Sequence, residues 1–270
     1  MRKSLRVIQD EYTKIVKKHN DLIQKSRFQL NVNEQKLVLS LISKIGYDDD
    51  DFKSYSFSLY EFCKLLNVSQ GGNNYAEIKK NIENITDKKL WLPVAEKKEA
   101  LVRWIEMPII EGNYVTVKIN PYLKPYLLQL KSNYTQYDLI YVLAMKHKYS
   151  IRLYEWIKSV HYRELEVYTT KIIPLEEIKH ILGIEGKSYE EYRFLKNRIL
   201  KKAIEEINQM TDKQIKAVEV KDGRKVVGLI FEIDTKEPME RLKIRKELEE
   251  KLGVGKQLSL FDLLEEKTDE

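Results

Sequence analysis

The stretch from residue 189 to residue 209, YEEYRFLKNRILKKAIEEINQ, constrains the fold most, because its pattern predicts one amphipathic helix. At about 100° per residue, one side of this helix is apolar and carries Tyr192, Leu195, Ile199, Ala203 and Ile207. The opposite side carries Arg193, Asn197 and Lys201, flanked by Phe194 and Arg198. The apolar stripe needs a core to pack against. The opposite row presents guanidinium, amide and ammonium groups at a spacing that fits a DNA groove.

The neighbouring segments predict the rest of a winged-helix module. Residues 174–184, PLEEIKHILGI, predict a short helix bounded by proline and glycine. Residues 214–233 contain two alternating runs around Asp222 and Gly223, which is a strong hairpin signal. The basic residues beside this turn are Lys221, Arg224 and Lys225. A helix, a turn, a second helix and a basic hairpin follow the order of a winged helix, although the same charges also suit a solvated helix packed on a hairpin.

Length and charge limit the class of protein. The chain has 270 residues, which is enough for two domains of ordinary size, each with its own core. Its hydrophobic content of 43% and charged content of 33% suit a folded, soluble protein. The formal net charge of +6 is compatible with a polyanionic partner but does not identify one.

Three features of the sequence predict a cytoplasmic protein. No run approaches the roughly 20 apolar residues of a membrane span, so we expect no membrane partner. The amino terminus, MRKSLRVIQDEY, is basic but lacks the apolar segment of a secretory signal. The single cysteine, Cys63, forms no internal disulfide and fits a reducing compartment.

The sequence predicts a protein that is not an enzyme and that needs no metal or cofactor. Its four histidines form no HxH or HExxH pair, and one cysteine excludes the cysteine-based zinc motifs. It contains no GxxxxGK[ST] or GxGxxG loop for a nucleotide. The alternative is a strand-nicking enzyme that uses one of the 17 tyrosines as its nucleophile. Such enzymes also need a metal held by paired histidines, which this chain lacks.

The first half repeats the winged-helix order in a looser form. The expected helices span residues 11–27, 33–45 and 75–90, with Asn33 as the cap of the second. The expected strands span residues 52–59, 91–94, 101–110 and 113–119, with a basic turn at 95–100. The predicted fold class is therefore α+β, with two tandem winged-helix domains, a C-terminal helix and a flexible tail. The predicted boundaries are 1–132, 133–235 and 236–270.

Five segments carry a family resemblance. In the first half it rests on residues 16–45, VKKHNDLIQKSRFQLNVNEQKLVLSLISKI. In the second half the segments are YSIRLYEWIK, IPLEEIKHILGI, SYEEYRFLKNRILKKAIEEINQMTD and GRKVVGLIFEI, and the last three lie in family order and spacing. Through these segments the chain resembles the initiator replication proteins of iteron-bearing, theta-replicating plasmids, often called RepA or RepB.

The resemblance implies a function in plasmid replication. It implies two winged-helix domains, of which the second recognises direct origin repeats, called iterons, in the major groove of double-stranded DNA. The first domain would contact the DNA backbone and form a homodimer. Monomers of such initiators help to open the origin, whereas dimers repress their own gene and help to limit plasmid copy number. The implied host partners are the initiator ATPase and the replicative helicase, because this chain has no motor of its own.

The resemblance and the helical pattern together select candidate DNA contacts. On the predicted helix these are Arg193, Asn197, Arg198 and Lys201. At its amino end, where backbone N–H groups favour phosphate, they are Lys187 and Ser188. On the wing they are Arg224 and Lys225, expected on phosphates or in the minor groove. In the first half they are Lys79, Lys80, Lys97 and Lys98, expected on the DNA backbone.

A pentapeptide near the carboxyl terminus, QLSLF, resembles the peptide by which bacterial proteins dock on the polymerase sliding clamp. It comprises Gln257, Leu258, Ser259, Leu260 and Phe261. Two leucines and a phenylalanine would fill an apolar groove while the glutamine makes fixed polar contacts. The alternative is an amphipathic segment folded onto the body of the protein. We predict a clamp-binding peptide, because it follows a charged helix and two glycines and precedes an acidic end.

Two binding functions without a replication role stay open at this point. A winged-helix transcription regulator would present the same DNA-binding face but has no use for a clamp peptide. A structural or partition protein would bind duplexes with little sequence preference, in a manner governed by salt. Tandem repeats in the DNA flanking the gene would discriminate among these functions and the strand-nicking enzyme.

Overall fold

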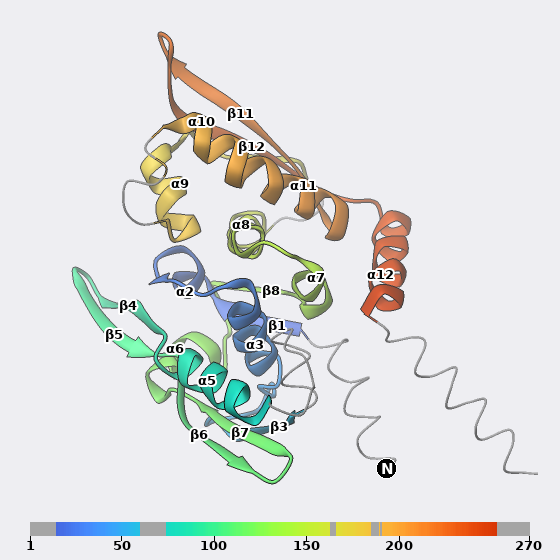
Figure 1. The fold of residues 1–270 in the computed structure, drawn as a ribbon. Coiled ribbons are helices and arrows are strands. Elements are labelled where there is room, and N and C mark those ends of the chain that lie inside the picture. The colour runs from blue at the N-terminus through green and yellow to red at the C-terminus, as the bar shows by residue number, and fades with distance from the viewer. Residues whose placement is uncertain (1–14, 60–73, 163–165, 185–188, 190, 253–270) are drawn as a thin grey trace, which may run out of the picture.

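The protein is described by a computed structural model that covers residues 15–59, 74–162, 166–184, 189 and 191–252. Figure 1 shows two groups of elements, with the long hairpin and α11 at one end and the β3, β6 and β7 strands at the other. Helix α8 (Lys148–Val160) lies between them. Most of its residues are buried, including apolar, polar and charged side chains.

The described chain begins with a strand, so our prediction of a helix over residues 11–27 is wrong. β1 (Ile15–His19) pairs antiparallel with β8 (Tyr134–Asp138), and the short helix α2 (Asn20–Gln24) follows it directly. The physical cause is Lys18, which is fully buried and whose Nζ lies 2.7 Å from a carboxylate oxygen of Glu155. Because a charged residue occupies an inward position of β1, the alternation of buried side chains is invisible in the hydrophobicity pattern.

The second helix is capped earlier than we predicted. α3 (Val32–Ile42) has Asn31 as its N-cap instead of Asn33. The Asn31 side-chain oxygen accepts hydrogen bonds from the backbone N–H groups of Asn33 and Glu34, both at 2.9 Å. The Glu34 carboxylate in turn accepts from the Asn31 N–H at 2.8 Å. This reciprocal capping box needs an acidic residue three positions after the cap, and Asn31 meets that condition whereas Asn33 does not.

Two sheets complete the first group of elements. One has the order β3-β7-β6, formed by Ser54–Ser58, Tyr114–Ile119 and Ile105–Glu111. The other has the order β2-β4-β5, formed by Arg27–Phe28, Lys89–Ala95 and Lys98–Arg103. α5 (Asn74–Thr86) packs beside β6.

The single strand that we predicted over residues 101–110 is wrong, because the chain divides at Trp104. Trp104 is buried, and its ring meets that of Phe28 edge to face with centroids 5.0 Å apart. The residues before it belong to β5 and those after it to β6, in different sheets. An aromatic residue that leaves the strand to fill the core therefore separates two runs that are continuous in the sequence pattern.

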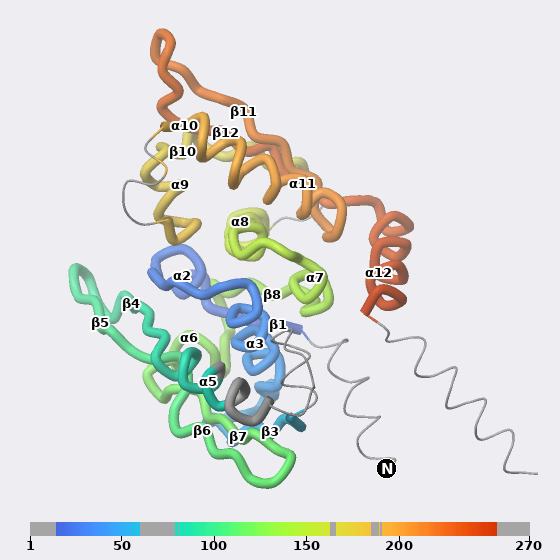
Figure 2. Tube along the Cα trace, in the orientation of Figure 1, coloured from blue at the N-terminus to red at the C-terminus, as the bar shows by residue number. Residues whose placement is uncertain are grey.

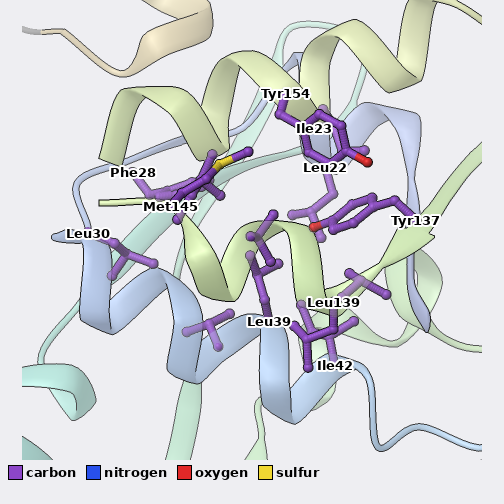
Figure 3. Packing of buried hydrophobic residues seen from close by; sticks show 14 of the residues in the cluster. Leu22, Ile23, Phe28, Leu30, Leu39, Ile42, Tyr137, Leu139, Met145 and Tyr154 are labelled. Atoms are coloured by element: carbon purple, nitrogen blue, oxygen red, sulfur yellow. The ribbon is translucent and has the colours of Figure 1, made fainter. Parts of the chain in front are cut away.

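Helices pack around the centre of the molecule. The short helices η1 (Pro121–Leu123) and α6 (Lys124–Leu127) precede β8, and α7 (Leu139–Ala144) follows it. Figure 3 shows apolar side chains from α2, α3, α7 and α8 meeting in one cluster, which includes Leu22, Leu39, Leu139, Met145 and Tyr154.

The second half has the predicted order of helix, helix and hairpin. α9 (Leu175–Leu182) is followed by a continuous helix made of α10 (Tyr192–Leu195), a π-helical segment η3 (Lys196–Leu200) and α11 (Lys201–Met210). β11 (Lys213–Asp222) and β12 (Lys225–Thr235) form the hairpin. The short strands β9 (Tyr168–Thr169) and β10 (Ile173–Pro174) also pair with β12.

The C-terminal helix and α8 connect the two halves of the chain. α12 (Pro238–Leu252) packs beside α7, as Figure 2 shows, and its Arg245 lies 2.8 Å from a carboxylate oxygen of Asp138. In α8, Arg152 donates a hydrogen bond to the carbonyl oxygen of Ile181 at 3.0 Å. β1 and β8 pair across the boundary that we predict between residues 132 and 133, and that boundary stays a prediction.

Candidate nucleic-acid interface

The helix over residues 192–210 buries the apolar side that the sequence predicts. Leu195, Ile199, Ala203 and Ile207 are each at most 2% exposed. The π-helical segment in its middle places Ile199 and Leu200 together against the core. Such single wide turns are frequent at functional sites. The helix begins at Tyr192, three residues later than predicted.

The outer side of this helix presents the predicted polar row. Arg193, Asn197, Arg198 and Lys201 are all exposed. The guanidinium carbons of Arg193 and Arg198 lie 5.1 Å and 4.8 Å from the centre of the Phe194 ring. These cation–π contacts hold the two guanidinium groups around one aromatic side chain. The row therefore offers planar N–H donors to solvent from a helix whose other side is fixed in the core.

The β11–β12 hairpin projects past α10, as Figure 1 shows. Its two-residue turn is formed by Gly223 and Arg224, between the paired residues Asp222 and Lys225. Gly223 has a φ of +58°, a left-handed conformation that costs glycine little because it has no Cβ. The predicted wing residues Arg224 and Lys225 are both exposed at this tip. The hairpin therefore carries cations to the edge of the same surface.

Sequence reasoning missed the contact between the wing and the helix. Glu219 of β11 accepts hydrogen bonds from Lys196 Nζ at 2.7 Å and from the Tyr192 hydroxyl at 3.0 Å. Lys221 Nζ lies 3.7 Å from its other carboxylate oxygen. The hydrogen bond from Lys196, supported by that from Tyr192, holds the pKa of the Glu219 carboxyl below its usual range. One feature of the sequence could have revealed this contact. Glu219 is a charged residue at a position of β11 that faces the helix, where the two preceding positions on the same face carry apolar residues.

Two buried carboxylates fix the inner side of the helix to the elements beneath it. Glu206 accepts hydrogen bonds from the backbone N–H groups of Lys146 at 2.7 Å and His147 at 3.3 Å, directly before α8. Asp212, just after α11, accepts a hydrogen bond from the Tyr154 hydroxyl at 2.7 Å. Burial, together with Asp212, raises the pKa of Tyr154 well above its ordinary value. These contacts set the orientation of the exposed row relative to the first half of the chain.

The lysines predicted in the first half lie in two separate places. Lys79 and Lys80 are exposed on α5, which Figure 1 shows at the opposite end of the molecule from α10. Lys97 and Lys98 are exposed at the turn between β4 and β5. They line a cleft of about 890 Å³ together with His180 of α9. The structure thus brings Lys97 and Lys98, but not Lys79 and Lys80, towards the second half.

Some predicted residues lie outside the described part of the chain and stay predictions. They are Lys187, Ser188, Gln257, Leu258, Ser259, Leu260 and Phe261. Within the described ranges, no three histidine, cysteine, aspartate or glutamate side chains are grouped so that they could hold a metal ion. Among the same residues, no helix has both the length and the apolar character that crossing a bilayer requires.

Comparison with known proteins gives two family matches that together span both halves. The family described as Initiator Replication protein, WH1, matches residues 15–158. The family described as Initiator Rep protein, WH2, matches residues 174–233. The first match alone covers more than half of the 270 residues. The segments that carried the resemblance lie almost entirely within these matches.

Individual proteins are similar to this chain over most of its length. The chain is similar to a Replication initiation protein of Escherichia coli, with 26% identity over 238 residues that cover 84% of this chain and 71% of that protein. It is similar in structure to the Pi initiator protein, solved in complex with iteron DNA, with a TM-score of 0.64 and 19% identity, covering 84% of this chain and 99% of that one. Domains 2 and 3 of RctB give a TM-score of 0.43 and 13% identity, covering 78% and 85%.

These findings confirm the predicted fold class. The likeness to the Pi initiator supports the mixed arrangement of helices and sheets that the structure shows. The family matches assign one winged helix to residues 15–158 and another to residues 174–233. The chain therefore belongs to the initiator replication protein family, and its two winged-helix domains are the WH1 and WH2 domains of that family.

Proposed function

We propose that this replication initiator binds the iterons of a plasmid origin, with the helix over residues 192–210 in the major groove. The observation that carries the proposal is the joint exposure of Arg193, Asn197, Arg198 and Lys201 on a helix whose opposite side is buried. A major groove admits one α-helix, and such a helix reads bases only if its polar side faces outward. The iteron complex of the Pi initiator, which has a similar fold, supports this assignment.

The side chains on this helix suit direct recognition of bases. An arginine donates two hydrogen bonds to O6 and N7 of guanine, and an asparagine pairs in the same two-point manner with adenine. Each such pair discriminates against a wrong base by about 1–3 kcal/mol. Arg193 and Asn197 are therefore the expected base contacts. Arg224 and Lys225 on the wing would bind phosphates, which orient the protein without reading sequence.

The first domain would add contacts to the DNA backbone and form the homodimer. Lys97 and Lys98 are the better-placed backbone contacts, because they lie at the cleft that reaches α9. Lys79 and Lys80 are on the remote helix α5 and would serve a different stretch of DNA. Lys187 and Ser188, just before the recognition helix, would bind phosphate. In dimeric form the protein would repress its own gene and limit plasmid copy number.

The protein would act by binding and assembly in the cytoplasm, without catalysing a reaction and without a cofactor. Its role at the origin would be to help separate the strands and to gather the host machinery. The expected partners are the initiator ATPase, the replicative helicase and, through residues 257–261, the polymerase sliding clamp.

The first experiment compares Arg193→Ala and Asn197→Ala with Lys246→Ala, a control that removes an exposed charge from α12. The probes are a duplex that the wild-type protein selects from a random pool, taken as the repeat, and a duplex of the same composition in shuffled order. Each interface variant should lose about 5- to 150-fold affinity for the repeats, corresponding to one lost base contact, and much less for the shuffled duplex. Equal losses on both duplexes would make these residues phosphate contacts and contradict base recognition.

A second experiment separates a replication initiator from a transcription regulator. A plasmid that carries only this gene, its flanking repeats and a selectable marker should replicate in a suitable host. The same plasmid with Arg193→Ala and Asn197→Ala should be lost. Failure of the wild-type plasmid to replicate, combined with intact repression of the promoter, would favour the regulator.

A further inference from the structure

A carboxylate lies in the middle of the basic surface that we assign to DNA. Glu219 is on β11 in the row that faces the helix, two residues after Ala217 and four after Ile215, and it pairs with Leu229 of the neighbouring strand. Ile215 and Leu229 are buried. An apolar residue would continue this row, so the presence of a glutamate calls for an explanation other than packing.

The carboxylate gathers two cations and a phenol. One oxygen accepts hydrogen bonds from Lys196 and Tyr192, at 2.7 Å and 3.0 Å, and the other lies 3.7 Å from Lys221 Nζ. The side chains of Lys196 and Lys221 are 53% and 56% exposed, whereas that of Glu219 is 24% exposed. Both ammonium groups therefore lie at the surface that DNA would approach, and each faces a negative charge of the protein itself.

This arrangement changes what the two lysines contribute to DNA binding. A cation that neutralises a phosphate releases counterions and adds about 0.9 to the slope of log affinity against log salt. Lys196 and Lys221 must first leave Glu219 to make such a contact, so the carboxylate competes with phosphate for them. Arg193 and Arg198 lie instead against the Phe194 ring, and Arg193 Nη2 is 3.9 Å from the exposed carboxylate of Glu191, so neither arginine is held by Glu219.

We propose that Glu219 determines specificity indirectly, by withholding Lys196 and Lys221 from phosphates and so weakening binding to random duplex more than binding to the cognate site. It is a positioning residue that acts through the two lysines and through the Tyr192 hydroxyl. The inference rests on the DNA-binding function proposed above. Its consequence is that part of the discrimination between iterons and other DNA comes from a negative charge that touches no base.

The test compares Glu219→Gln with Glu232→Gln. The amide of the first variant keeps an oxygen that accepts hydrogen bonds but loses the charge. Glu232 lies on β12, where it pairs with Lys216 at 3.2 Å. Lys216 is three residues before Glu219 on β11 and so points to the other face of the hairpin. The control therefore removes the same charge from the same hairpin and raises the net charge equally, but away from the helix.

The measurement is affinity as a function of salt, on a duplex selected by the wild-type protein from a random pool and on a shuffled version of it. On the shuffled duplex, Glu219→Gln should bind about tenfold more tightly at low salt, with a slope steeper by about 1–2. On the selected duplex the gain should be smaller, so the ratio of the two affinities falls. Glu232→Gln should match the wild type on both.

Several outcomes would overturn the inference. A slope for Glu219→Gln equal to that of Glu232→Gln would show that the lysines are not withheld. An equal loss of affinity on both duplexes would mean that Glu219 only orders the wing. Adding Lys196→Gln to Glu219→Gln should reverse part of the steeper slope, and no reversal would also count against the inference. A wild-type protein that does not discriminate between the duplexes would instead refute the proposed function.

Discussion

Replacing Asp212 with asparagine tests how the helix over residues 192–210 is joined to the WH1 domain. Asp212 follows α11 in WH2, and its carboxylate accepts hydrogen bonds from the Tyr154 hydroxyl at 2.7 Å and from Lys158 Nζ at 2.9 Å. Both partners belong to α8 in WH1. The Lys158 and Asp212 side chains are only 7% and 8% exposed. Asparagine keeps the shape and one acceptor but leaves the buried ammonium opposite a neutral group.

The expected loss of stability follows from that buried charge. Removing one partner of a buried ion pair costs about 3–5 kcal/mol, because the remaining charge loses the carboxylate that offsets its desolvation. The retained amide oxygen keeps part of the hydrogen bonding, so we expect the lower end, about 3 kcal/mol. Removing the ammonium as well, with Lys158→Met, should recover about 2 kcal/mol of this loss, since a neutral pair of similar volume carries no uncompensated charge.

The assay is urea unfolding followed by circular dichroism, for the wild type, the two single variants and the double variant. Asp222→Asn, the same substitution in the exposed wing turn, is the control and should leave the free energy of unfolding unchanged to within about 0.5 kcal/mol. If Asp212→Asn is as stable as the control, the Lys158–Asp212 pair contributes nothing to the free energy of unfolding. If the double variant loses the sum of the single losses, the two residues act independently and the reasoning fails.

Two further predictions concern a tight turn and the carboxyl terminus. Gly183 has a φ of +67°, and a Cβ there would lie 2.9 Å from the carbonyl oxygen of Phe28; Gly183→Ala should therefore lower the free energy of unfolding by about 1–3 kcal/mol, and an unchanged urea midpoint would contradict this. Leu260→Ala combined with Phe261→Ala should abolish capture by immobilised sliding clamp without affecting DNA binding. Glu265→Ala should be captured normally, and capture of the double variant would rule out the clamp peptide.

The WH2 domain was predictable because its helix and its hairpin both show regular spacing of apolar residues along the sequence. The inward side of the helix over residues 192–210 is mostly apolar, with Leu195, Ile199, Ala203 and Ile207, although Glu206 is also buried, so a period of 3.6 is plain in the sequence. The Asp222-Gly223 dipeptide indicates the hairpin, whose turn is formed by Gly223 and Arg224. Exposure of the four polar residues on the helix followed from the same geometry. The π-helical segment was not predictable, since it shifts the register of the helix without any change in composition.

The WH1 domain was harder to predict because its structure depends on contacts distant in sequence. In the sequence pattern, β1 resembles part of a helix, because the pattern does not show that Lys18 is buried against Glu155. These two residues lie near opposite ends of the WH1 sequence. The break at Trp104 depends likewise on the ring of Phe28. At the candidate site, the carboxylate of Glu219 was missed for the same reason. Its partners are on another element, and a single-sequence pattern records no contacts between elements.

Buried polar contacts on α8 hold the WH1 and WH2 domains together. Glu155 binds Lys18 at one end of WH1, whereas Arg152 and Lys158 reach Ile181 and Asp212 in WH2. Each contact is directional and would be costly to break, so the two domains keep one relative orientation more strictly than apolar packing alone would require. If the wing and the β4–β5 turn bind the same duplex, binding of one places the other beside the DNA. The second of these two contacts then forms without the entropy cost of ordering a flexible linker. The contacts of Arg152 and Lys158 would in this way let weak phosphate contacts in one domain strengthen the proposed base recognition in the other.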